Sequence, residues 1–268
     1  MRRVLLGLVA AVVAVTTAAA ACAAAAPPGG LASAPAVRPV VLGEEPHDPT
    51  AFTQGLELSP DDPGTLYEGT GLAGRSQLRE LDAATGAVRR AVPLPGGLFG
   101  EGITVVGPSI WQLTWQDGVA LEWDRATFTL RRQVPIAGEG WGLCAEPTPG
   151  PGRLVRSDGT DRLRFHDPVT FAETGSVAVT LDGAPVTDLN ELECVGGAVW
   201  ANVWRTDRIV RIDPATGAVT AVVDASGLLD PARRADTDVL NGIAHLSGDE
   251  YLLTGKLWPA AFRVRLPG

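Results

Sequence analysis

The chain has 268 residues, of which 45% are hydrophobic and 20% are charged, and its formal net charge at pH 7 is −9. That negative charge excludes nucleic acid as a partner, because phosphate backbones are bound by basic surfaces. The length allows one large domain with a substantial core, after a leader at the start of the chain.

The start of the chain has the layout of an export leader. Two arginines are followed by an apolar run that ends in small residues, which predicts a secretory signal peptide over residues 1–21. Cleavage is expected either at an Ala-x-Ala site or just before Cys22, and in the second case a lipid on Cys22 would anchor the protein to the outer face of a bacterial membrane. Residues 22–36 are nearly all Ala, Pro and Gly and predict a flexible tether. We therefore expect an exported protein, secreted or lipid-anchored, that is a monomer with its folded domain over residues 37–268.

A short pattern recurs along this domain: a polar or aromatic residue, then glycine, then an apolar residue. Its copies are Gln54-Gly55-Leu56, Glu101-Gly102-Ile103, Trp141-Gly142-Leu143 and Asn241-Gly242-Ile243, with a looser copy at Glu191-Leu192-Glu193. The steps between copies are 47, 40, 50 and 50 residues. A period of this size predicts a repeat architecture.

A second series of motifs has the same period. An Asp-x-x-Thr sequence between alternating apolar runs follows each of the first four copies and predicts a hairpin turn, because Asp and Thr side chains bond to the turn backbone. The four motifs begin at Asp82, Asp124, Asp167 and Asp213. Each repeat then supplies about four strands, so the sequence predicts an all-β fold, a five-bladed β-propeller.

The last repeat is one strand short. The apolar run Val37–Leu42 lies ahead of the first repeat and is placed to supply that strand, so that an N-terminal strand closes the ring. The alternative fold is a β-sandwich whose spacing is coincidental. Residues 224–238, between the last two inner strands, predict a short helix that covers one end.

The cysteines and histidines give weaker indications. Cys144 and Cys194 each lie three residues after matching positions in consecutive repeats, which allows either a disulfide or two buried thiols. His47, His166 and His245 have no ligand spacing and are interpreted as structural or surface residues.

Matching positions of a propeller form a ring around one mouth of its channel. The predicted ring is Gln54, Glu101, Trp141, Glu191 and Asn241, with Asn190 beside Glu191. Such polar residues can be structural or can form a pocket.

Four tryptophans lie in or just after inner strands and favour an apolar cleft close to Glu101 and Lys256. They are Trp115, Trp141, Trp204 and Trp258. The other three, Trp111, Trp123 and Trp200, are expected in the core.

Taken together, the motifs resemble those of the plant and bacterial type of glutaminyl-peptide cyclotransferase over nearly the whole domain. The motifs are Thr53-Gln54-Gly55-Leu56, Phe99-Gly100-Glu101-Gly102-Ile103-Thr104, Gln112-Leu113-Thr114-Trp115, Gly138-Glu139-Gly140-Trp141-Gly142-Leu143, Leu189-Asn190-Glu191-Leu192-Glu193, Ala201-Asn202-Val203-Trp204, Val239-Leu240-Asn241-Gly242-Ile243-Ala244 and Thr254-Gly255-Lys256-x-Trp258-Pro259. The segment from Pro147 to Arg153 departs from the family pattern.

The resemblance implies a five-bladed propeller that needs no metal or other cofactor and converts the N-terminal glutamine of peptides or proteins to pyroglutamate with loss of ammonia. It implies that Glu101 is the essential carboxylate. The pocket residues it implies are Phe52, Gln54, Phe99, Trp115, Trp141, Asn190, Trp204 and Lys256.

Two alternative hypotheses assign the same propeller fold a different function. One is a metal-dependent lactonase or hydrolase in which Glu101, Asn190, Asn241 and an Asp bind a divalent cation. The other is a non-catalytic propeller that binds a peptide or surface partner. Glu101→Gln separates catalysis from binding, and a chelator separates the metal enzyme from the cyclotransferase.

Overall fold

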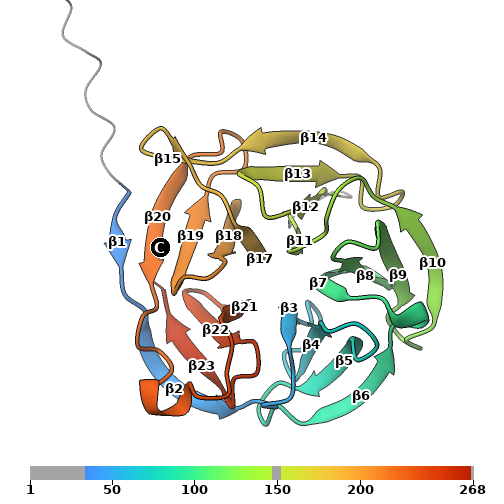
Figure 1. Ribbon diagram of the computed structural model, residues 1–268, viewed down its shortest axis with the longest axis horizontal. Helices are drawn as coiled ribbons and strands as arrows, with labels where there is room; N and C mark the ends of the chain where they lie inside the picture. The colour runs from blue at the N-terminus through green and yellow to red at the C-terminus, as the bar shows by residue number, and fades with distance from the viewer. Residues whose placement is uncertain (1–33, 147–151, 267–268) are drawn as a thin grey trace, which may run out of the picture. The chain divides into compact units, whose positions relative to one another are not determined.

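The computed structural model describes residues 34–146 and 152–266, which belong to one compact unit, Ser33–Gly268. Five sheets surround a central axis in chain order (Figure 1), so the predicted five-bladed β-propeller is confirmed. The predicted signal peptide, Cys22 and most of the tether lie outside the described residues. Within those residues, no helix combines the length and hydropathy needed to cross a membrane.

Each blade is a four-stranded antiparallel meander whose first strand faces the axis (Figure 1). Blade 1 contains β3 (Thr53–Leu58), β4 (Thr65–Thr70), β5 (Gln77–Asp82) and β6 (Val88–Pro93). Blade 2 contains β7 (Gly100–Val106), β8 (Ser109–Thr114), β9 (Val119–Asp124) and β10 (Leu130–Pro135). Blade 3 contains β11 (Leu143–Ala145), β12 (Leu154–Arg156), β13 (Arg162–His166) and β14 (Glu173–Ala178).

Blades 4 and 5 include strands from the start of the chain. Blade 4 contains β17 (Leu189–Val195), β18 (Ala198–Val203), β19 (Arg208–Ile212) and β20 (Val219–Asp224), with β1 (Ala36–Val37) added in parallel at its outer edge. Blade 5 contains β21 (Leu240–Ser247), β22 (Glu250–Gly255) and β23 (Ala260–Arg265), and β2 (Val40–Pro46) completes it by pairing with β23. Closure by an N-terminal strand is therefore confirmed, although Val37 pairs with blade 4 rather than blade 5.

The Asp-x-x-Thr motifs form the predicted hairpin turns between the third and fourth strands of blades 1 to 4. In blade 1, the Asp82 carboxylate accepts hydrogen bonds from the backbone N–H and the hydroxyl of Thr85, both at 2.9 Å. Asp124 and Asp167 bind the threonine three residues on in the same way. Because Asp and Thr side chains bond to the turn backbone locally, the same short sequence can form this turn in each of the four blades.

The core lies between neighbouring blades. Trp111, Trp123 and Trp200 are at most 2% exposed, as predicted for core tryptophans. The segment before blade 5 contains the short 3-10 helix η2 (Pro231–Arg233), which fulfils the expectation of a short helix there. Another 3-10 turn, η1 (Pro95–Gly97), precedes β7, and the hairpin β15 (Thr180–Leu181) and β16 (Ala184–Pro185) leads from blade 3 to blade 4.

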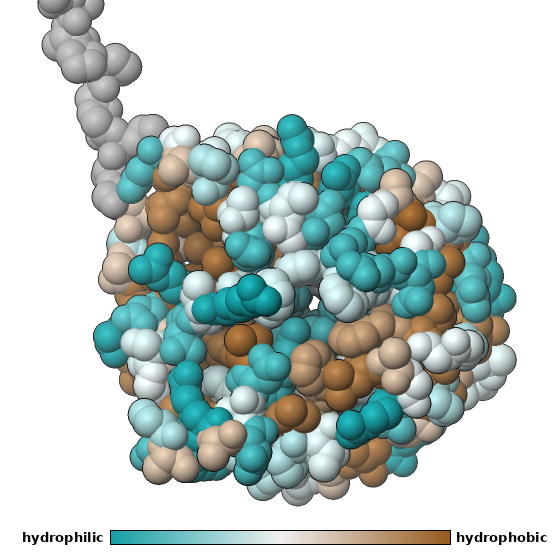
Figure 2. Space-filling view, viewed as in Figure 1, coloured by the Kyte–Doolittle hydropathy of each residue, from teal (hydrophilic) through white to brown (hydrophobic). Residues whose placement is uncertain are grey.

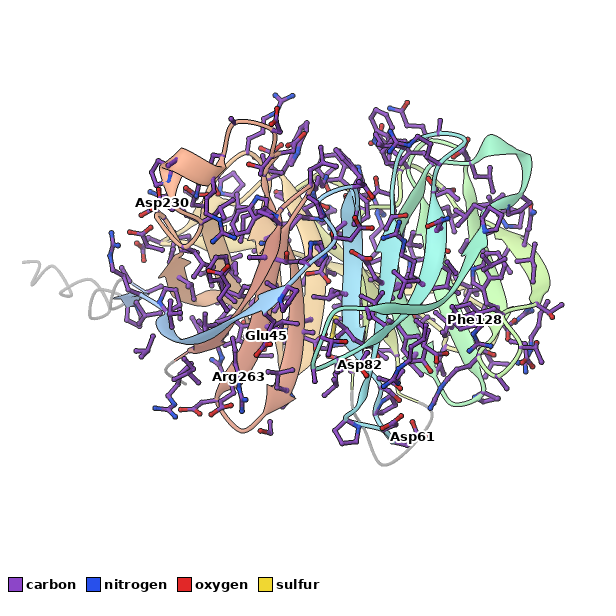
Figure 3. The ribbon with its side chains drawn as sticks, turned by 90° about the horizontal axis from the view of Figure 1, so that it is seen from below. Glu45, Asp61, Asp82, Phe128, Asp230 and Arg263 are labelled. Atoms are coloured by element: carbon purple, nitrogen blue, oxygen red, sulfur yellow. A yellow bond between two sulfur atoms is a disulfide. The ribbon has the colours of Figure 1, made fainter. Side chains whose placement is uncertain are left out.

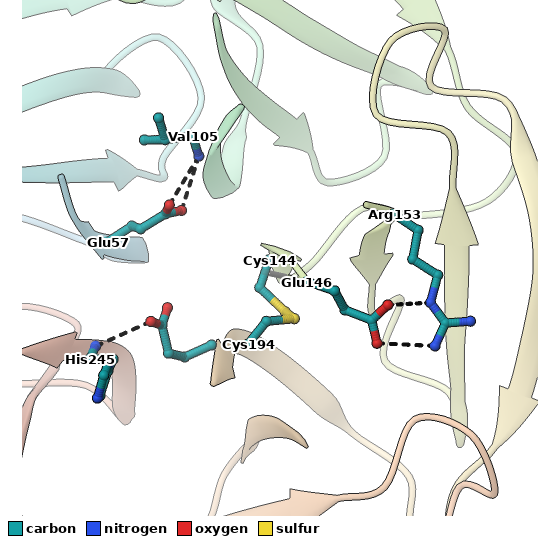
Figure 4. Close-up of a disulfide and its surroundings, with 8 residues drawn as sticks. Glu57, Val105, Cys144, Glu146, Arg153, Cys194 and His245 are labelled. Atoms are coloured by element: carbon teal, nitrogen blue, oxygen red, sulfur yellow. Dashed lines mark hydrogen bonds and ion pairs between the residues drawn. A yellow bond between two sulfur atoms is a disulfide. The ribbon is translucent and has the colours of Figure 1, made fainter. Parts of the chain in front are cut away.

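A disulfide joins the inner strands of blades 3 and 4. Cys144 in β11 and Cys194 in β17 are bonded, with their Cα atoms 5.5 Å apart (Figure 4). The disulfide alternative that the sequence left open is therefore the one found. It lies beside Glu57 and Glu193, which bond to the backbone N–H groups of Val105 and His245 (Figure 4).

The two ends of the blades are distinct. Seen from the side, Asp230, next to η2, lies at one end of the strands and Asp61, in the turn after β3, lies at the other (Figure 3). We call these the η2 end and the disulfide end, because Cys194 and the turn after β3 line one hollow at the Asp61 end.

Candidate active site

The ring of polar side chains at the η2 end is created by irregularities at the start of the inner strands. In β7, Gly100 pairs with Thr114 and Ile103 pairs with Gln112, so Glu101 and Gly102 form a bulge. Such bulges re-aim side chains beside active sites.

The same irregularity recurs in β17, between Leu189 and Leu192, and in β21, between Leu240 and Ile243. The residues that match Glu101 are therefore Asn190 and Asn241. The prediction that Glu191 occupies the ring position of the fourth repeat is wrong by one residue.

The glycine of the recurring pattern is required by close packing around the axis. A Cβ on Gly142 would lie 2.0 Å from the carbonyl oxygen of Asn190, and one on Gly102 would lie 2.7 Å from that of Trp141. The inner strands therefore approach each other too closely for a side chain at these two positions. Each glycine therefore packs directly against the backbone of Asn190 or Trp141, which lies at the start of the next inner strand.

A cavity of about 420 Å³ opens at this end, and the structure brings to its wall every site residue that the family resemblance implied. The predicted residues on the wall are Phe52, Gln54, Phe99, Glu101, Trp115, Trp141, Asn190, Trp204 and Lys256. Leu72, Arg205, Asp238 and Val239 also line it. On the face viewed in Figure 2, hydrophobic residues gather beside the axial opening on the side of blade 1.

The aromatic side chains pack edge to face in two groups around the cavity. Phe99 lies 6.2 Å from Phe52 and 5.4 Å from Trp115, measured between ring centroids. Trp141 and Trp204 form a second pair at 5.2 Å. Edge-to-face packing stabilises such pairs beyond their burial, so the walls of the cavity are preformed.

Glu101 is 4% exposed and has few partners. Its carboxylate accepts a hydrogen bond from the side-chain N–H of Gln54 at 3.0 Å, and the side-chain oxygen of Gln54 accepts one from the Asn241 side chain at 3.2 Å. Burial raises the pKa of Glu101 well above its usual value; nearby Lys256 opposes this and the Glu139 carboxylate adds to it. The group therefore keeps its proton to higher pH than an exposed glutamate.

Lys256 and Asn190 present polar atoms that form no hydrogen bond with the residues that the structure describes. Lys256 is 4% exposed, its ammonium lies 4.9 Å from the centre of the Phe52 ring, and burial lowers its pKa against the opposing charges of Glu101 and Asp238. The Oδ1 atom of Asn190 is buried with no hydrogen-bond partner among the residues that the structure describes. Buried polar groups without a partner are costly, and these two line the cavity, so both are candidates for binding a ligand.

Glu139 is a residue of the site that the sequence interpretation gave no role. One of its carboxylate oxygens accepts hydrogen bonds from the indole N–H groups of Trp115, at 2.7 Å, and Trp141, at 2.8 Å. It thereby joins the two aromatic groups across blades 2 and 3. The sequence Gly138-Glu139-Gly140 repeats the glycine-flanked acid of Gly100-Glu101-Gly102 and was the available indication.

A buried arginine holds the backbone of the Glu139 loop. Arg156 is fully buried and donates hydrogen bonds to the carbonyl oxygens of Glu139, at 2.6 Å, and Ala137, at 3.1 Å. Its Nε lies 3.1 Å from Nε2 of His166, whose pKa is lowered by burial, so the neutral ring accepts this hydrogen bond. His166 is structural, as predicted, because it holds Arg156, which in turn bonds to the backbone of the Glu139 loop.

Trp258 is not part of the cavity. It is 1% exposed in the core between blades 4 and 5, and its indole N–H donates to the carbonyl oxygen of Asp238 at 2.9 Å. The expectation that it helps to form the cleft is wrong. Its place near the end of an inner hairpin matches that of the other tryptophans, but its side chain turns into the blade.

No group of three or more His, Cys, Asp or Glu side chains in residues 34–146 and 152–266 is arranged to hold a metal ion. Two residues of the metal-dependent alternative have hydrogen bonds within the protein. Glu101 bonds to Gln54, and Asn241 donates to the carbonyl oxygen of Thr53 at 3.0 Å as well as to Gln54.

Comparisons with known proteins agree on one family. The model of the family described as glutamine cyclotransferase matches residues 8–266. A glutaminyl-peptide cyclotransferase of Arabidopsis thaliana is 40% identical over 234 residues, which cover 84% of this chain and 70% of that protein. The crystal structure of Myxococcus xanthus glutaminyl cyclase superposes with a TM-score of 0.76 at 41% identity, covering 85% of this chain and 97% of that one.

Proposed function

Since this chain belongs to the glutamine cyclotransferase family, we propose that it converts the N-terminal glutamine of peptides and proteins to pyroglutamate and releases ammonia. The observation that carries the proposal is the setting of Glu101. A buried carboxyl group with a single side-chain partner faces an aromatic cavity large enough for a glutamine residue.

The reaction needs one proton to move between two nitrogens of the same substrate. The α-amine attacks the γ-amide carbon, a C–N bond forms, and the amide nitrogen leaves as ammonia only after it gains a proton. Glu101 accepts the proton that the amine loses and delivers it to the departing nitrogen, so the carboxyl group ends in the state in which it began. No net proton is consumed inside the cavity.

The raised pKa of Glu101 suits the delivery step. A carboxyl group at its usual pKa is a poor proton donor at neutral pH, whereas burial keeps this one protonated to higher pH. The substrate amine has a pKa of about 8, so an appreciable fraction is already uncharged and nucleophilic near neutral pH. A weak base is therefore sufficient for the attack.

Negative charge develops on the γ-oxygen in the tetrahedral intermediate. Lys256 and the side-chain N–H of Asn190 are the donors that we assign to it, because both residues line the cavity and no hydrogen bond in the described part of the chain uses either donor. An amide hydrogen of Gln54 is already used to hold Glu101. Donors fixed before the reaction stabilise such charge without reorganisation.

The aromatic walls select the reactive shape of the substrate. The five-membered ring forms only when the glutamine side chain folds back on its own amine. We assign this selection to the aromatic residues that line the cavity, which are Phe99, Trp115, Trp141 and Trp204.

Incubation of the purified domain with a Gln-initiated peptide tests the proposal. We expect the peptide to lose the mass of one ammonia, measured by mass spectrometry, while the same peptide with an acetylated amine remains unchanged. Activity that persists in a chelator is expected for this mechanism, and activity that disappears and returns with a divalent cation would support the metal-dependent alternative. A peptide that binds but is never converted would support the non-catalytic alternative.

We further propose that the protein is exported. Residues 1–21 have the composition of a signal peptide, and the Cys144–Cys194 disulfide suits an oxidising compartment. Mass analysis of the mature protein from its own cells distinguishes cleavage at an Ala-x-Ala site from lipid attachment at Cys22. A full-length cytoplasmic product would contradict export.

A further inference from the structure

A second hollow adjoins the cavity on the side of blades 4 and 5. It has a volume of about 420 Å³ and is lined by residues 205–207 and by residues from the segment after η2. Arg205, Asp238 and Val239 line both hollows, so they form a shared wall. A peptide advances about 3.5 Å per residue, so the residues after a bound glutamine must leave through the mouth and pass near this wall.

Arg205 lies at the tip of a tight turn on this wall. The backbone N–H of Thr206 donates to the carbonyl oxygen of Val203 at 3.2 Å, and Arg205 has a left-handed φ of 61°. Leu72 and Leu257 occupy the matching turns of blades 1 and 5, also with positive φ. The left-handed backbone is thus shared by the turns after the second strands of these three blades. The positively charged side chain of Arg205 distinguishes the turn of blade 4.

The guanidinium of Arg205 is held in place by an aromatic ring. It lies 3.9 Å from the centre of the Trp204 ring, which fixes its orientation by cation–π contact. Among the residues that the structure describes, no carboxylate pairs with it. The nearby Asp207 is engaged by Arg234, with their closest atoms 3.4 Å apart. An exposed planar cation next to a peptide-sized hollow is well suited to bind a carboxylate.

We propose that Arg205 and the second hollow bind the peptide residues that follow the glutamine, and that Arg205 pairs with a carboxylate among them. This inference rests on the proposed function, since it assigns the path of the same substrate. The carboxylate has two sources, an acidic side chain in the second to fourth residue or the terminal carboxylate of a short peptide. The protein would then favour acidic over neutral sequences after the glutamine.

Four amidated peptides and one dipeptide pair test this. The amidated set carries glutamate at the second, third or fourth position, or glutamine at all three, and the pair is Gln-Ala with a free or an amidated C-terminus. An exposed ion pair contributes about 0.2–1 kcal/mol, so we expect kcat/KM to be roughly 1.5- to 5-fold higher for the best acidic peptide than for the neutral one. The two sets separate the side-chain source from the terminal source.

Two variants assign the preference to Arg205. In Arg205→Gln, the ratio of acidic to neutral kcat/KM is expected to fall to about one. Arg208→Gln removes an exposed arginine that lines neither hollow and is expected to keep the wild-type ratio. A ratio near one in the wild-type protein, or an unchanged ratio in Arg205→Gln, would overturn the proposal.

Binding measured without turnover separates this inference from the proposed function. In the Glu101→Gln background, tryptophan fluorescence reports peptide binding, and the acidic peptide is expected to bind more tightly than the neutral one by a similar factor. Carboxylate-dependent binding with no conversion by the wild-type protein would contradict the proposed activity but would still support binding of the peptide in the second hollow. Conversion without any carboxylate dependence would contradict the role of Arg205 and the second hollow but would still support the proposed activity.

Discussion

The two ends of the axial channel both contain buried glutamates with raised pKa values. At the η2 end, burial raises the pKa of Glu101, and toward the disulfide end burial raises those of Glu57, Glu191 and Glu193. The residue type, the direction of the shift and its main cause are the same. The difference lies in the hydrogen-bond partners.

The glutamates toward the disulfide end connect inner strands of different blades. Glu191 accepts hydrogen bonds from the backbone N–H groups of Leu56, at 3.3 Å, and Ile243, at 2.9 Å. Glu57 and Glu193 each accept one from a neighbouring blade. Among the described residues, no backbone N–H donates to Glu101, which lines the cavity. Glu57 and Glu193 also line a hollow, but backbone N–H groups hold their carboxylates. A raised pKa alone therefore does not identify a catalytic carboxyl group, and neither does a place beside a hollow. The role proposed for Glu101 rests in addition on the lack of a backbone hydrogen bond to it in the described part of the chain.

The largest expected effect is the loss of activity in Glu101→Gln. General acid–base catalysis contributes about 10²- to 10⁴-fold, so we expect kcat to fall by that factor while the melting temperature is unchanged or higher, because a neutral amide is cheaper to bury. Glu191→Gln is the matched control, since it changes an equally buried glutamate of the same channel. It is expected to lower the melting temperature and keep kcat. If Glu191→Gln instead lost kcat and Glu101→Gln kept it, Glu191 rather than Glu101 would be the residue needed for activity.

The second prediction concerns the disulfide. Cys144 and Cys194 are 50 residues apart, and closing a loop of that length stabilises a fold by about 4 kcal/mol at most. The Cys144→Ser, Cys194→Ser double variant should unfold at clearly lower denaturant concentration. Its kcat in the absence of denaturant should be close to that of the wild type. A large loss of kcat with unchanged stability would contradict the division between the two ends.

The third prediction is a decrease in stability with rising pH. Burial raises the pKa of Glu57 from its ordinary value of 4.5 to about 7, so the folded protein binds a proton that the unfolded chain has released. Between these values the free energy of unfolding falls as pH rises, by at most about 1.4 kcal/mol per pH unit for one group.

A matched variant isolates the contribution of Glu57. Glu57→Gln keeps an acceptor for the backbone N–H of Val105 and removes the titration. Urea unfolding from pH 5 to 7 should give a shallower slope for Glu57→Gln than for the wild type. Equal slopes would mean that Glu57 titrates alike in both states.

Much of the fold was predictable because its chemistry is local and repeated. Each Asp-x-x-Thr turn satisfies its own backbone, so the period is visible in the sequence. The ring position of Asn190 could not be predicted from the sequence, because the bulge between Leu189 and Leu192 depends on pairing with β18. Glu191, which lies beside Asn190, is also polar. The alignment of polar residues alone could not choose between them.

The site was predictable as a set of residues but not as a network. The motifs named Glu101 and eight wall residues, all of which line one cavity. They did not reveal that Glu139 joins Trp115 to Trp141, because that contact crosses two blades. They also did not separate Trp258 from the wall tryptophans, since the direction of a side chain at the end of a hairpin depends on packing.

The smallest expected effect concerns Glu139 at the η2 end, which bonds to two tryptophans of the cavity wall and is not itself among the residues that line the cavity. Its carboxylate adds to the raised pKa of Glu101, so Glu139→Gln is expected to lower that pKa and to move the Glu101 limb of the kcat profile to lower pH. The glutamine can still accept an indole hydrogen bond, so KM should rise only slightly. Glu139→Ala frees both indoles and should raise KM further, by about 3- to 10-fold for the loss of roughly 1 kcal/mol. A residue with only a structural role would lower stability in both variants and leave the pH limb in place. A shifted limb in Glu139→Gln together with the larger KM in Glu139→Ala would separate the two contributions of this carboxylate, one through charge and one through the walls.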